Sequence, residues 1–132
     1  MAEARTLVAG EASGEALVLD EPLSFWGGLD PETGRLIDVH HPQFGEVVTG
    51  RVLVMPSGRG SSSSSSVLAE AIRAGTAPAA IVLLEPDPIV ALGAIVAREL
   101  YGTSVPVVVA SDVPRGRVRV SATGGSARIG RA

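Results

Sequence analysis

The chain has 132 residues, of which 45% are hydrophobic and 3% aromatic, so one domain with a core of Val, Leu, Ile and Ala is expected. The absence of cysteine excludes disulfides, cysteine zinc sites and cysteine-ligated iron–sulfur clusters on this chain. A net charge of −3 without a basic run argues against nucleic-acid binding, and the uncharged runs are too short to cross a membrane. With no apolar signal core at the N-terminus, we expect a single cytoplasmic domain over residues 1–132.

Two short strands and a long polar loop are predicted in the first part of the chain. Residues 5–9 and 14–19 are short apolar runs typical of strands. Residues 27–51 are rich in Gly, Pro and polar side chains, which predicts a long loop with one short strand at most, and loops of this length are often functional. The adjacent His40 and His41 in this loop are more typical of a solvated loop than of a metal site.

Strands and helices alternate in the remainder of the chain. Buried strands are predicted at residues 52–55, 79–85 and 105–110, and helices at residues 67–75 and 88–100. In the second helix, the stripe expected to face the core is Ile89, Leu92, Val96 and Leu100. Residues 117–122 alternate polar and apolar side chains, which predicts a half-exposed strand that pairs with residues 126–130 across the Gly124-Gly125 turn.

This order of elements predicts the fold class. Strands connected by helices imply an α/β core with parallel central strands. The early and late strands are expected to pair into a barrel-like cap. We therefore predict a mixed β-sheet or partial barrel with strand–helix–strand units.

Six consecutive serines, residues 61–66, lie between a predicted strand and a predicted helix. Such a run alone is typical of a flexible linker, but a linker here would divide one compact unit. The alternative is a glycine turn in which Gly58 and Gly60 allow positive φ or close approach of a ligand, and the first serines cap the helix. The amides at the helix start, together with Arg59, would then attract a carboxylate or a phosphate.

A serine at such a turn can also transfer a proton, because helix-end amides and Arg59 stabilise its oxyanion. Its position directly after the turn favours Ser61 over the later serines. Glu85 and Asp87, on either side of Pro86, are predicted to be turn and cap residues.

Two motifs, SFWGGLDPETG at residues 24–34 and GRGSS followed by VL within residues 58–68, resemble the small subunit of the aconitase X family. These proteins are hydro-lyases related to aconitase, and the resemblance extends from about residue 5 to residue 122. It implies the swivelling domain of an aconitase-like enzyme. It also implies a large-subunit partner that carries an iron–sulfur cluster or metal, with no cofactor on this chain.

The resemblance implies that the serine after a Gly-[Lys/Arg]-Gly motif is the catalytic base, and in this chain that position is Ser61. Many relatives have Gly and an aromatic residue where this chain has Ser64 and Ser66, so Ser62 remains an alternative. Substitution of Ser64 or Ser66 is expected to have mild effects. The residues expected to contact a small anionic substrate are Gly58, Arg59, Gly60, Ser62 and Ser24, and none is expected to bind a metal.

Known members of the family dehydrate cis-3-hydroxy-L-proline or 5-phosphomevalonate. The chain has arginine but no lysine, which is typical of a GC-rich bacterial genome and favours the hydroxyproline reaction. Two other interpretations stay open: a non-catalytic anion-binding or regulatory module, and a structural domain with a serine-rich linker.

Overall fold

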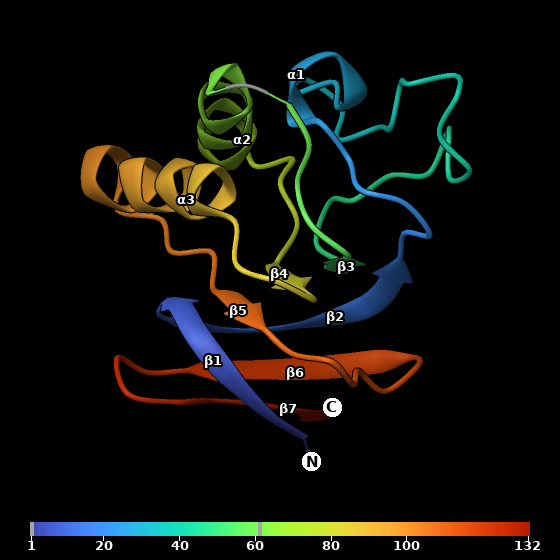
Figure 1. Cartoon of the computed structure of the whole chain (residues 1–132). Helices are drawn as coiled ribbons and strands as arrows, with labels where there is room; N and C mark the ends of the chain where they lie inside the picture. The colour runs from blue at the N-terminus through green and yellow to red at the C-terminus, as the bar shows by residue number, and fades with distance from the viewer. Residues whose placement is uncertain (1, 61) are drawn as a thin grey trace.

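The structure is a computed structural model that describes residues 2–60 and 62–132. Its elements, in chain order, are β1 (Ala2–Val8), β2 (Gly10–Val18), α1 (Phe25–Gly28), β3 (Val52–Met55), α2 (Ser63–Ala74), β4 (Ala80–Leu83), α3 (Pro88–Tyr101), β5 (Val107–Val109), β6 (Arg117–Ala122) and β7 (Ala127–Arg131) (Figure 1). Within these described residues, none of the helices combines the length and apolar character that a membrane span requires.

The strands form a closed barrel in the order β1-β5-β4-β3-β2-β6-β7. The four strands β2, β3, β4 and β5 run parallel, and the other pairs are antiparallel. Parallel neighbours need long crossover connections, which α2 and α3 provide between β3, β4 and β5. The predicted α/β architecture is confirmed, with a barrel that is closed and not partial. The predicted hairpin is also confirmed, since β6 pairs with β7.

Strands β3 and β4 are buried on both faces, which explains their continuous apolar sequences. Val54 and Val82 belong to the core inside the barrel, whereas Leu53 and Ile81 belong to a second core. This second core also contains Leu68 of α2. Figure 1 shows α2 and α3 on one side of the barrel, with β6 and β7 on the opposite side. The two helices therefore cover the parallel strands.

The predicted stripe of α3 is wrong at Leu92 and Leu100, whereas Val96 packs against the core. Leu92 and Leu100 are 47% and 68% exposed. The buried residues of this helix are Val90, Gly93, Ala94 and Ala97. Helix α3 has apolar residues around most of its circumference, so the spacing of these residues does not show which side faces the core. The side with small residues is buried because α3 packs closely against α2. A Cβ on Gly93 would lie 2.8 Å from the Ser65 carbonyl oxygen of α2.

The serine run is mostly helical. Helix α2 begins at Ser63, four residues before the predicted start, and ends at the predicted cap Gly75, which has a φ of 80°. Ser63–Ser66 therefore form its first turn. A flexible linker at this position is excluded for these four serines, while Ser61 lies outside the described residues.

The long loop is held by buried side chains and by isolated bridges between Leu29 and Leu36 and between Arg35 and Val47. His41 is buried, so the prediction of a solvated histidine is wrong for this residue. Its Nδ1 accepts a hydrogen bond from the Gln43 amide, which leaves Nε2 to donate to the Glu21 carbonyl, each at 3.1 Å. Both ring nitrogens are thus used to fix the loop. Across the described residues, no group of three or more His, Asp or Glu side chains is placed to hold a metal.

Candidate functional site

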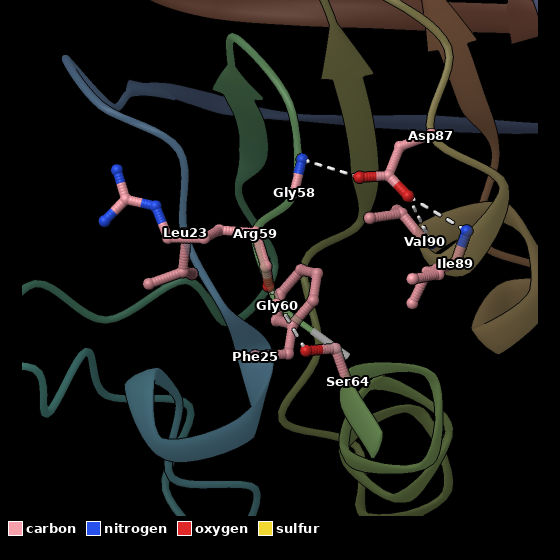
Figure 2. Close-up of a pocket in the computed structure, with 9 residues that line it drawn as sticks. All are labelled: Leu23, Phe25, Gly58, Arg59, Gly60, Ser64, Asp87, Ile89 and Val90. Atoms are coloured by element: carbon pink, nitrogen blue, oxygen red, sulfur yellow. Dashed lines mark hydrogen bonds between the residues drawn. The ribbon is translucent and has the colours of Figure 1, made fainter. Parts of the chain in front are cut away.

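A small pocket lies where β2, β3 and β4 end, at the carboxyl edge of the parallel strands. Its cavity volume is about 40 Å³. Three segments far apart in sequence meet there: residues 23–25, the turn at 58–60 with Ser64, and residues 87–90 (Figure 2). The carboxyl edge of parallel strands is where α/β proteins commonly bind ligands. The structure thus brings together the expected residues Gly58, Arg59 and Gly60.

The turn at residues 58–60 is fixed by backbone contacts on both sides. Gly58 forms a parallel bridge with Leu23, and the Arg59 amide donates to the Leu23 carbonyl at 3.0 Å. On the other side, the Gly58 amide donates to Oδ2 of Asp87 at 2.9 Å. The turn is therefore a continuation of the β2–β3 pairing and is also tied to the start of α3.

Asp87 is the N-cap of α3, as predicted. Its Oδ1 accepts from the amides of Ile89 and Val90 at 2.9 and 3.3 Å. Sequence reasoning missed its second role, in which Oδ2 anchors Gly58. A Cβ on Gly58 would lie 2.6 Å from Oδ2 of Asp87 and 2.9 Å from Cγ2 of Val90. Glycine is needed here because the cap of α3 comes so close to the turn.

We expect Gly58→Ala to lower the free energy of unfolding by about 1–3 kcal/mol, because the added methyl group overpacks this contact. Gly124→Ala is the matched control, since a Cβ there would meet nothing within 4 Å. Denaturant unfolding of both variants measures the difference. Equal midpoints for the two variants would show that Asp87 and Val90 move aside without cost.

Gly60 has a φ of 101°, which confirms the expected positive φ at this position. A Cβ at Gly60 would lie 2.7 Å from Oγ of Ser24 and 3.6 Å from Oγ of Ser64. Gly60 therefore packs directly against two hydroxyl groups, one from each side of the turn.

The serines differ sharply in their surroundings. Ser62 is exposed and precedes α2, but its side chain makes no capping hydrogen bond, so the predicted side-chain cap is wrong for Ser62. Its carbonyl instead accepts from Oγ of Ser65 at 2.6 Å. Ser64 is buried, with 3% of its surface exposed. Its Oγ lies 3.3 Å from Oγ of Ser24, which was expected at the site.

Arg59 is one of the residues that line the pocket, and its side chain carries a positive charge beside the turn. Its side chain is exposed, and within residues 2–60 and 62–132 no carboxylate forms an ion pair with it. The nearby carboxylate of Asp87 is engaged by backbone amides. Figure 2 shows the guanidinium on the opposite side of the turn from Asp87. The guanidinium is thus available to an anion.

The pocket is too small to enclose an organic substrate. A volume of about 40 Å³ has room for ordered water but not for a hydroxy acid. A substrate would have to lie across the opening, against the turn and Arg59. The turn at residues 58–60 is thus one wall of a small, open pocket.

The closed barrel, the two helices that cover its parallel strands and the glycine turn at their carboxyl edge define a class of domain. The family model "Aconitase X swivel domain" matches residues 1–129. The chain belongs to the aconitase X swivel-domain family, as the motifs in its sequence indicated.

Similar proteins include two kinds of dehydratase and a solved structure. Cis-3-hydroxy-L-proline dehydratase from Pseudomonas aeruginosa is 60% identical over 103 residues, which are 78% of this chain and 18% of that protein. The phosphomevalonate dehydratase small subunit from Methanothermobacter thermautotrophicus is 47% identical over 95 residues, 72% of each chain. The crystal structure of Thermococcus kodakaraensis aconitase X in its holo-form superposes with a TM-score of 0.84 at 38% identity, covering 97% of this chain and 96% of that chain. The chain thus spans less than two thirds of the hydroxyproline dehydratase.

Proposed function

We propose that this chain is the swivelling subunit of an aconitase X-type dehydratase that acts together with a larger partner chain. The observation that carries the proposal is the guanidinium of Arg59, which pairs with no carboxylate of the described residues and belongs to a fixed turn directly before Ser61 in the sequence. The small size of the pocket beside this turn supports the need for a partner, because that pocket alone cannot surround a substrate.

The names of two relatives support the substrate class that we propose. Cis-3-hydroxy-L-proline and 5-phosphomevalonate each carry a carboxylate and a hydroxyl group on the β carbon. We propose cis-3-hydroxy-L-proline as the substrate, because one relative named for it is 60% identical, compared with 47% and 52% for two relatives named phosphomevalonate dehydratase small subunit. The carboxylate common to both molecules suits the charge of Arg59.

In the proposed reaction, the alkoxide of Ser61 takes the proton from the carbon next to the carboxylate. The electrons of that C–H bond form a carbon–carbon double bond, the β C–O bond breaks, and the oxygen leaves as hydroxide that becomes water on protonation. A serine hydroxyl is a poor base near neutral pH, so it needs stabilisation of its oxyanion. Arg59 and the amides at the start of α2 are proposed to provide this stabilisation.

The residues present do not fit a metal or an iron–sulfur cluster. The chain has no cysteine, and in the described part of the chain no cluster of acidic or histidine side chains could hold a metal. We therefore assign any iron–sulfur cluster or metal of the complex to the partner chain.

We expect Arg59→Ala to raise the KM of the assembled enzyme about tenfold or more, because a charge-assisted contact to the carboxylate is lost. The melting temperature should change little, since Arg59 is exposed. Arg73→Ala is a suitable control, because Arg73 is an exposed arginine of α2 that pairs with Glu70. Unchanged KM with a large loss of stability would make Arg59 a structural residue.

The direct test of the proposed function is to co-express this chain with a large aconitase X subunit from the same genome. The purified complex is then assayed with cis-3-hydroxy-L-proline and 5-phosphomevalonate side by side. We expect the higher kcat/KM with cis-3-hydroxy-L-proline. A preference for 5-phosphomevalonate would correct the substrate, and no dehydration of either compound would refute the proposal.

A further inference from the structure

Ser64 is a buried polar side chain whose position the proposed reaction does not use. It lies in the first turn of α2 and is 3% exposed, whereas Ser62 and Ser66 are exposed. A buried hydroxyl costs stability unless it is hydrogen-bonded. The partners of Ser64 therefore indicate what it does.

The Ser64 hydroxyl lies between residues 24–26, which are far from it in sequence, and the turn at residues 58–60. The Trp26 amide in α1 donates to its Oγ at 3.3 Å, and Oγ of Ser24 lies at the same distance. On the other side, Oγ of Ser64 donates to the Arg59 carbonyl at 3.5 Å. That carbonyl belongs to the peptide that joins Arg59 to Gly60, so Ser64 makes a long hydrogen bond to this peptide.

Ser24 completes the arrangement from α1. Its Oγ donates to the Trp26 carbonyl at 2.9 Å. Together with Ser64 it forms a pair of hydroxyls against Gly60, where a Cβ would lie 2.7 Å from one and 3.6 Å from the other. The position after Gly60 in the sequence is Ser61, the proposed base.

We propose that Ser64 is a positioning residue, which acts with Ser24 on the Arg59–Gly60 peptide, the peptide that precedes the proposed base in the sequence. This inference rests on the proposed function. It replaces the expectation that substitution of Ser64 is mild, because Ser64 is buried and contacts the Trp26 amide and the Arg59 carbonyl. A displacement of about 1 Å in a catalytic group can cost a hundredfold in rate, so a lost anchor has a large effect on kcat.

The first test uses the assembled enzyme. We expect Ser64→Ala to lower kcat about tenfold to a hundredfold, with a smaller change in KM. Ser66→Ala is the matched control, because it makes the same change on the same helix at an exposed position. Ser64→Cys retains a weak donor and acceptor and should recover part of the lost kcat. If Ser64→Ala retains the parent kcat while Ser61→Ala is inactive, the inference is wrong and the proposed function stands.

The second test needs no catalysis. In the amide spectrum of the full chain labelled with ¹⁵N, Ser64→Ala should shift the signals of Trp26 and Gly60, and Ser66→Ala should leave them in place. Unmoved signals in Ser64→Ala would overturn the inference, whether or not the complex turns over. The amide spectrum therefore tests the role of Ser64 separately from the proposed function, since its result does not depend on whether the complex has dehydratase activity.

A further variant covers the case in which Ser64→Ala unfolds. Ser24 is half-buried, so Ser24→Ala removes the other hydroxyl at lower risk to the fold. It should also lower kcat and shift the Gly60 amide. Where both single variants fold, the fold-decrease in kcat of the double variant should be smaller than the product of the two single fold-decreases, because both side chains act on the same peptide. Independent, multiplicative losses would contradict a shared role.

Discussion

Ser61→Ala is expected to lower the turnover of the assembled enzyme about a hundredfold to ten-thousandfold, which is the usual effect of removing a general base. Subunit assembly and substrate binding should persist, because the carboxylate contact assigned to Arg59 is retained. Loss of a helix-capping serine costs about 1 kcal/mol at most sites, which a folded complex survives. Measuring melting temperature, substrate affinity and turnover on one preparation separates these effects.

The control for Ser61→Ala is Ser62→Ala, because the register of the motif leaves both serines open as the base. Ser62 is exposed and makes no side-chain cap, so its removal should not disturb α2. An inactive Ser62→Ala with an active Ser61→Ala would move the base by one residue. Activity in both variants would place the base elsewhere in the complex.

The chain without its partner is expected to fold but to show no dehydratase activity. Its two cores are built from its own strands and helices, so a cooperative unfolding transition is expected. The pocket of about 40 Å³ cannot enclose the substrate, and the chain has no cysteine to ligate a cluster. Assay of the purified chain before and after addition of the large subunit measures the gain. Turnover by the chain alone would refute the requirement for a partner.

The sequence predicted the secondary structure better than the side-chain environments. Period and turn residues located β3, β4, α3 and the β6–β7 hairpin, because those signals are local. The start of α2 was missed because serine favours caps and turns over helix interiors. Closure of the barrel depends on the pairing of β1 with β7, at the two ends of the chain. Local sequence patterns do not predict which distant strands pair.

The site was predicted only in part, for the same reason. Gly58, Arg59 and Gly60 stood out through the glycine turn, whereas Asp87 was recognised only as a cap. Ser64 could have been found by extending the helical period backwards, since it lies one turn before the buried Leu68. The contact of Ser64 with Ser24 could not have been predicted from the sequence, because it depends on where α1 packs in the folded chain.

The pairing of β1 with β7 also bears on how this domain can be built into larger proteins. Ala2 is paired with Ile129, so the two chain ends leave the barrel side by side, away from α2 and α3 (Figure 1). A covalent connection at either end would therefore leave the wall formed by the Gly58–Gly60 turn uncovered. The same barrel can accordingly be encoded as a separate gene product or as a segment of a longer polypeptide. This agrees with relatives in which the matched region makes up 72% of one protein and 18% of another.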